Sequence, residues 1–124
     1  MGLVRAVISV RGSKQIEKLL EGLVLLNVGE LRAGRCPPLY ESGARYVREP
    51  LGQEDWQTAT EVFRSKHGDC EDLAAYLAAS YRVRGVAARC KIIDIRPGLK
   101  HVVVELPDGS IEDPSKKLGM KGRA

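Results

Sequence analysis

The chain has 124 residues, of which 44% are hydrophobic, and carries a formal net charge of +4. This length fits one compact domain over residues 1–124, with enough apolar material for a core without disulfide bonds. No apolar run approaches the roughly 20 residues of a membrane-spanning helix, and the N-terminus lacks the pattern of a signal peptide. We therefore expect a soluble, cytoplasmic protein with no membrane partner. The basic residues lack interleaved aromatic residues, which disfavours a nucleic-acid partner.

Residues 1–34 predict one helix behind a short extended segment. Residues 3–10 are rich in β-branched side chains, which is typical of a short strand or an ordered N-terminal arm. Ser13 is a candidate N-cap for a helix over residues 14–32, where isoleucine and leucine recur at helical spacing. Gly34 and the prolines after it should end this helix.

Residues 36–120 are expected to form the rest of the core, beginning with irregular structure. Residues 39–55 contain turn residues and no long period, so we expect an ordered loop with a short extended piece around residues 46–48. Residues 58–66 suit a short helix that ends before Gly68.

A second long helix is predicted to begin at Cys70. Asp69 occupies the N-cap position, and Asp72 follows three residues later, as in a capping box. Apolar residues then recur at helical spacing on the side that carries Cys70, and Gly85 suits the residue at which the helix ends. Cys70 is therefore expected in the first turn, on the buried face.

Strands are expected after this helix. Residues 86–95 and 101–106 alternate between apolar and polar side chains as strands do. Asp108-Gly109 then predicts a hairpin turn into a short strand over residues 111–113. Helices followed by an antiparallel sheet indicate the α+β class.

The three cysteines, Cys36, Cys70 and Cys90, form no CxxC pair, and their odd number leaves at least one thiol free. Cys36 and Cys90 suit structural positions. Cysteine and histidine are zinc ligands, but only His67-x-x-Cys70 has a compact ligand spacing. We therefore predict no metal site and no cofactor.

Cys70 is the candidate nucleophile. A cysteine attacks as the thiolate, and the free N–H groups and macrodipole of a helix N-terminus favour that charged form. The neighbouring Asp69, Glu71 and Asp72 oppose it. We expect modest opposition, because Glu71 should point about 100° away around the helix and the two aspartates should cap the backbone. The alternative is an inert, buried thiol.

Two histidines are candidate bases. His67 lies three residues before the cysteine, whereas His101 begins an apolar strand. Asp113, on the return strand, is the natural group to orient His101, although it could instead simply begin a turn. A regular hairpin would pair Asp113 with Val104, on the wrong face for His101. The contact therefore requires a bulge, a longer loop or a bend.

Four short segments stand in a definite order along the chain. They are Gly68-Asp69-Cys70-Glu71-Asp72-Leu73-Ala74, Arg84-Gly85-Val86-Ala87-Ala88-Arg89, His101-Val102-Val103-Val104 and Asp113-Pro114. In this order they resemble the transglutaminase-like (papain-like) cysteine enzyme superfamily. With Tyr40-Glu41-Ser42-Gly43 and Trp56-Gln57 upstream and Asp108-Gly109-Ser110 before the aspartate, the chain is similar to the small form encoded by phages and prophages. The resemblance implies a papain/transglutaminase-like α+β fold, in which the helix of the catalytic cysteine packs on a small antiparallel sheet.

The resemblance also implies a catalytic triad of Cys70, His101 and Asp113 that transfers the acyl group of an amide or peptide bond, as a cysteine peptidase, amidase or transglutaminase. An oxyanion hole would be made by the Cys70 backbone N–H and an upstream donor, for which Trp56 or Gln57 is a candidate. Trp56 equally suits a core position. The implied partners are a protein or peptide substrate and phage structural proteins, in the bacterial host cytoplasm or the virion.

A non-enzymatic alternative stays open. A small protein of this type could be a structural or assembly component of a phage particle that keeps the triad as a relic. The net charge of +4 does not separate the two hypotheses.

Overall fold

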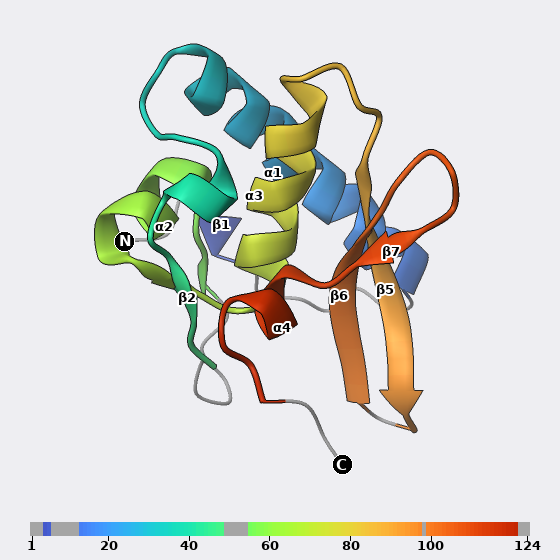
Figure 1. Cartoon of the computed structure of the whole chain (residues 1–124). Helices are drawn as coiled ribbons and strands as arrows, with labels where there is room; N and C mark the ends of the chain where they lie inside the picture. The colour runs from blue at the N-terminus through green and yellow to red at the C-terminus, as the bar shows by residue number, and fades with distance from the viewer. Residues whose placement is uncertain (1–3, 6–12, 49–54, 98, 122–124) are drawn as a thin grey trace.

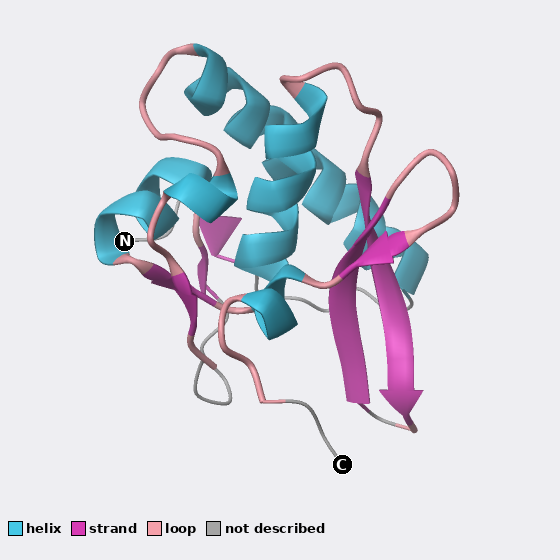
Figure 2. Ribbon diagram, viewed as in Figure 1, coloured by secondary structure: helices cyan, strands magenta, loops and turns pink. Residues whose placement is uncertain are grey.

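The computed structural model describes residues 4–5, 13–48, 55–97 and 99–121. Within these ranges the chain is a small α+β domain with helices beside a three-stranded antiparallel sheet (Figure 2), which confirms the predicted class. Helix α3 (Cys70–Arg82) runs through the middle, with α1 (Ser13–Arg32) behind it in Figure 1. At its side lies the sheet of β5 (Arg89–Arg96), β6 (Leu99–Glu105) and β7 (Ile111–Glu112). None of the described helices is both long and apolar enough to cross a bilayer.

Helix α1 confirms the long helix predicted near the N-terminus and forms one wall of the core. Its buried side chains are Leu20, Leu23, Val24 and Asn27. Gly34 follows in the left-handed conformation, with φ of 74°, and donates its N–H to Leu31 O, which ends the helix as predicted. Of the strand predicted over residues 3–10, only β1 (Val4–Arg5) lies in the described part, where it pairs with β3 (Asp55–Trp56).

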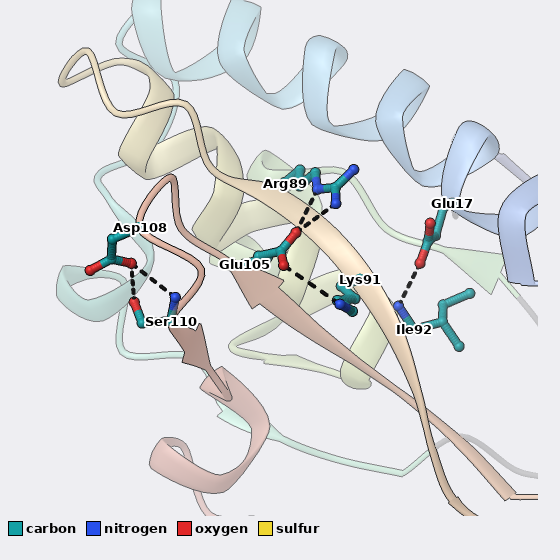
Figure 3. A network of polar contacts seen from close by, with 7 residues as sticks. All are labelled: Glu17, Arg89, Lys91, Ile92, Glu105, Asp108 and Ser110. Carbon is teal, nitrogen blue, oxygen red and sulfur yellow. Dashed lines mark hydrogen bonds and ion pairs between the residues drawn. The ribbon is translucent and has the colours of Figure 1, made fainter.

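Acidic side chains fasten α1 to its neighbours. Glu17 accepts the backbone N–H of Ile92, on β5, at 2.9 Å (Figure 3). Glu21 accepts two hydrogen bonds from the Arg82 guanidinium, at 2.6 and 2.7 Å. The helix is thereby fixed against both the sheet and the end of α3.

Helix α2 (Ala59–Ser65) confirms the short helix predicted in this region. Thr58 caps it in a capping box. Asn27 and Glu30, from α1, also accept the backbone N–H groups of its first two residues, at 2.8 and 2.9 Å. These contacts satisfy N–H groups that a helix start leaves without partners of its own.

Part of the loop predicted over residues 39–55 is regular. It contains the 3-10 helix η1 (Leu39–Glu41) and β2 (Arg45–Tyr46), which overlaps the expected extended piece. Residues 49–54 lie outside the described part. β2 pairs in parallel with β4 (His67–Gly68), a strand that the sequence did not indicate. This pairing brings the loop to the start of α3.

Helix α3 begins at Cys70, as predicted, but it ends at Arg82 and not at Gly85. The N–H groups of Arg84 and Gly85 bond the carbonyls three residues back, so the chain tightens into a turn before the glycine. Gly85 then takes the left-handed conformation, with φ of 86°. All residues of α3 from 72 to 80 are buried, which makes it the central helix of the domain.

The β6–β7 hairpin has a longer loop than a two-residue turn. Leu106 donates to Ser110 O, so residues 107–109 form the loop, with Gly109 in the left-handed conformation. Val104 consequently pairs with Glu112 and not with Asp113, and the longer loop is one of the three irregularities that the contact of His101 with Asp113 requires. Figure 3 shows the Asp108 carboxylate accepting from Ser110, which holds this loop.

Two boundaries differ from the prediction at the C-terminal end of the core. β5 starts at Arg89 and not at residue 86. Asp113 does not continue β7, but caps the short helix α4 (Pro114–Lys117), which was not predicted. Helix α4 packs against α3, β2 and β6, and so closes this side of the sheet.

Candidate active site

Cys70 is the first residue of α3, and the aspartates around it form the helix cap. Asp69 Oδ1 accepts the N–H of Asp72 at 3.1 Å, and Asp72 Oδ2 accepts the N–H of Asp69 at 3.2 Å. This reciprocal capping box confirms the pattern that the two aspartates predict. All three cysteines are free thiols, but Cys36 and Cys90 are buried, whereas Cys70 is partly exposed.

Gly68 lets the segment before Cys70 pack closely. A Cβ atom at this position would lie 3.0 Å from Asp72 Cβ and 3.4 Å from side-chain atoms of Leu73 and Val62. Gly68 does not have a positive φ, so lack of space and not backbone conformation favours glycine here. The glycine of the Gly-Asp-Cys segment therefore positions the start of α3 against its neighbours.

His101 and Asp113 meet, as the sequence predicts. His101 Nε2 lies 2.8 Å from Asp113 Oδ2, and the histidine is only 5% exposed. The longer hairpin loop explains the contact: with Val104 opposite Glu112, Asp113 falls on the same face of the sheet as His101. An ionised carboxylate can only accept a hydrogen bond, so Nε2 is the donor of this pair, and in the neutral imidazole Nδ1 is then the basic nitrogen.

A second carboxylate, Glu112, holds the residue next to Asp113 in place. Tyr40 and Tyr81 donate to its two oxygens, and Lys117 Nζ lies 3.4 Å from Oε2. Although burial acts to raise it, the hydrogen bonds from the two tyrosines lower the pKa of Glu112. Contacts from η1, α3 and α4 thus converge beside Asp113. Sequence alone does not indicate these contacts, because both tyrosines lie far from Glu112 in the chain.

The Cys70 thiol makes its hydrogen bond elsewhere. Sγ donates to Glu71 Oε1 at 3.2 Å, and within the described ranges no hydrogen bond joins Cys70 to His101. Burial raises the pKa of Cys70, and the Glu71 carboxylate raises it further, whereas the backbone N–H of Val102 lowers it. Because this N–H reaches the thiol, Cys70 lies against β6 at Val102, the residue directly after His101.

The electrostatic prediction for Cys70 was wrong. We expected the helix start to lower the thiol pKa and Glu71 to point away. The structure has the opposite arrangement, because the flexible Glu71 side chain reaches the thiol and burial disfavours the thiolate. The resting state of this corner is consequently a neutral thiol.

The two oxyanion-hole candidates have different surroundings. The Gln57 amide donates to His67 O at 3.1 Å and to Asp72 Oδ2 at 3.3 Å, so both of its N–H bonds are used. Trp56 is 1% exposed, and its Nε1 has no hydrogen-bond partner in the described part of the chain. Gln57 therefore braces the α3 cap, while Trp56 keeps an unused donor within the core.

Asp69 and Asp72 share a crowded, largely buried corner. Burial raises the pKa of both carboxyls, and each stands beside the negative charge of the other or of Glu71. Asp72 also accepts the backbone N–H of Gln57 at 2.8 Å, which favours its ionised form. Full ionisation of the pair is therefore harder than for two separate carboxyls.

Two further residues bear on the site. His67, the other candidate base, is exposed on β4, and the structure gives it no side-chain hydrogen bond to Cys70 within the described ranges. Tyr46 lies beside Gly68 through the β2–β4 pairing. Burial raises the pKa of Tyr46, and the neighbouring acidic groups Cys70 and Asp69 raise it further, so this tyrosine lies at the edge of the site. No local sequence signal indicated it.

Comparisons with protein-family models, curated proteins and solved structures gave no match to this chain. Over the described residues, no three His, Cys, Asp or Glu side chains are grouped as a metal ion would require. The geometry offers a partly exposed thiol at a helix start and a buried histidine that contacts the carboxylate of Asp113, directly after the adjoining strand β7. Nucleophilic acyl transfer uses a thiol, a base and an orienting group of these types.

Proposed function

We propose that this chain catalyses thiol-dependent acyl transfer on an amide or peptide bond, with Cys70 as nucleophile, His101 as base and Asp113 as the group that orients the base. The observation that carries the proposal is the 2.8 Å contact between His101 Nε2 and Asp113 Oδ2. This contact leaves Nδ1 as the basic nitrogen of His101. His101 lies on β6, and the backbone N–H of the next residue, Val102, acts to lower the pKa of the Cys70 thiol.

The reaction begins with a rotation of the Cys70 side chain from Glu71 toward His101. Nδ1 takes the thiol proton, and Sγ attacks the carbonyl carbon of the amide. The backbone N–H of Cys70 is one donor for the resulting oxyanion, and Trp56 Nε1 is the candidate second donor; each such donor is worth about 3 kcal/mol. The imidazolium then returns its proton to the leaving amine, which leaves a thioester that water or an amine cleaves.

The finer fold assignment is part of the same proposal. The order of cysteine, histidine and aspartate along the chain supports a papain/transglutaminase-like domain of the small phage or prophage type. The cysteine is at a helix start, the histidine is on β6, and the aspartate directly follows the adjoining strand β7. Its substrate would be a protein or peptide.

Alkylation of Cys70 by iodoacetamide tests the proposal. We expect His101→Ala to slow alkylation at about pH 7.5 by about 100-fold, because a positioned general base contributes 10²–10⁴-fold. His67→Ala, which removes the exposed histidine, should leave the rate unchanged. Peptide mass analysis identifies the labelled cysteine. Equal rates for the wild type and His101→Ala would overturn the proposal.

One observation favours a second candidate function. The thiol donates to Glu71, and its pKa is raised, as suits a cysteine that no longer reacts. The chain would then be a structural or assembly component of a phage particle that keeps the His101–Asp113 pair for stability. That candidate predicts equal alkylation rates for the two histidine variants.

A further inference from the structure

Glu71 is a carboxylate in contact with the candidate nucleophile. Its Oε1 accepts the Cys70 thiol hydrogen at 3.2 Å, and the residue is only partly buried. Within the described ranges it takes part in no ion pair, unlike Glu21, Glu105 and Glu112, each of which holds a cation. Glu71 therefore lies, partly exposed, beside Sγ and has no ion-pair partner among the described residues.

Two further acidic side chains lie beside Glu71. Asp69 and Asp72 form the cap of α3, and burial raises the pKa of both carboxyls. Arg48 is a cation near this corner. Burial raises the pKa of Tyr46, and Asp69 and Glu71 raise it further, whereas Arg48 lowers it. On the other side His101 is paired with Asp113.

We propose that Glu71 determines the charge specificity of the site: it admits amides that carry a positively charged group close to the scissile bond and disfavours those that carry a negative one. The inference rests on the proposed function and adds the substrate class. A cation at this position pairs with Glu71 and displaces the thiol from Oε1. The freed thiol then turns to His101, so substrate charge and activation of the nucleophile are coupled.

Coulomb interactions set the size of the effect. Two unit charges a few ångströms apart interact weakly in water and more strongly near a protein surface. A reagent charge held by a flexible chain beside Glu71 should fall near the weaker limit, where attraction of a cation and repulsion of an anion each change the rate by about threefold. Cationic and anionic reagents should therefore differ by about tenfold in rate beyond their intrinsic difference.

The test uses three methanethiosulfonates that transfer a thioalkyl group to a thiol: the neutral methyl reagent, the cationic trimethylammonioethyl reagent and the anionic sulfonatoethyl reagent. The measured quantity is the rate ratio of cationic to anionic reagent at Cys70, relative to the same ratio for 2-mercaptoethanol. We expect about tenfold for the wild type. Glu71→Gln, which keeps an acceptor oxygen for the thiol, should lower it at least threefold. Glu41→Gln removes an exposed carboxylate on η1 and should leave it unchanged.

A wild-type ratio equal to that of 2-mercaptoethanol would overturn the inference, as would an equal ratio in Glu71→Gln and the wild type. The neutral reagent separates this inference from the proposed function. If His101→Ala leaves the rate with the neutral reagent unchanged, the general base is absent and the proposed function fails. If His101→Ala slows that reagent and the charge ratio does not depend on Glu71, only the specificity assignment fails.

Discussion

The two corners that meet at the candidate site are built in opposite ways. In the histidine corner, formed by β6, β7 and α4, His101 is buried against Asp113, and the tyrosines on Glu112 fix the adjoining residue. In the cysteine corner, at the start of α3, carboxylates crowd the thiol and disfavour its charged form. The proposed base is thus organised in advance, while the proposed nucleophile rests in a state that must change before it can react.

This contrast fits a site whose reactivity depends on the substrate. A thiolate–imidazolium pair present at rest would need a lowered cysteine pKa, which burial and Glu71 prevent. A general base that already holds the correct tautomer needs only the arrival of the thiol. We therefore expect substitutions in the histidine corner to change the rate of reaction, and substitutions in the cysteine corner to change stability and its dependence on pH.

The largest effect should come from the orienting carboxylate. Asp113→Ala removes the acceptor for Nε2–H and lets the imidazole change tautomer, so alkylation of Cys70 should slow by about 100-fold. The variant also loses the α4 cap, which costs about 1 kcal/mol, so the free energy of unfolding by urea must be measured beside the rate. Asp113→Asn retains a capping oxygen and serves as the matched control for stability. An unchanged rate in both variants would remove Asp113 from the site.

Next in size is the packing in front of Cys70. Gly68→Ala places a Cβ 3.0 Å from Asp72 Cβ, and overpacking of this kind costs about 2 kcal/mol. The midpoint of urea unfolding should fall accordingly. Gly22→Ala is the matched control, because a Cβ there meets no atom within 4 Å and alanine is the better helix former. If Gly68→Ala were as stable as Gly22→Ala, the segment before Cys70 would have room for a Cβ atom, which contradicts the close packing at Gly68.

The smallest effect concerns pH. Burial and Asp72 raise the pKa of Asp69 in the folded protein above the ordinary value of 3.8. A raised carboxyl pKa contributes stability that is complete below the ordinary value and declines as the pH rises through the raised one. Asp69→Asn keeps a capping side chain without the charge, so its stability relative to the wild type should increase with pH, by about 1 kcal/mol.

Asp108 provides the opposite control for this pH dependence. Hydrogen bonds from Ser110 lower the pKa of Asp108, so its contribution is present above the ordinary value of 3.8 and declines on acidification. Asp108→Asn should therefore lose stability relative to the wild type at neutral pH and recover in acid. Parallel pH profiles for Asp69→Asn and Asp108→Asn would contradict the contrast between the two corners.

Local signals predicted much of this fold. The leucine spacing of α1, the short α2 and the aspartate cap before Cys70 all correspond to described elements, because each depends on residues close in sequence. The sequence likewise singled out His101 and Asp113, and with them the requirement for an irregular hairpin. Which irregularity occurs depends on the Pro107-Asp108-Gly109 loop, whose length shifts the register by one residue.

What the sequence did not predict depends on distant contacts or on side-chain conformation. The β2–β4 pairing that brings Tyr46 to the site joins short segments without a strand pattern of their own. The tyrosines on Glu112 come from η1 and α3. Helical geometry directs the Glu71 Cα–Cβ bond away from Cys70, but the remaining rotatable bonds allow its carboxylate to return. Burial of the thiol, and after it this return of the Glu71 carboxylate, reversed the expected shift of the cysteine pKa.

The protonation state of His101 is the most direct test of an organised base beside a resting thiol. Long-range proton–nitrogen NMR spectra at about pH 8.5, well above the ordinary histidine pKa of about 6.5, distinguish the two ring nitrogens. The account predicts a proton on Nε2, held by Asp113, and an unprotonated Nδ1. A proton on Nδ1, either in the other neutral tautomer or in an imidazolium paired with a Cys70 thiolate, would contradict it.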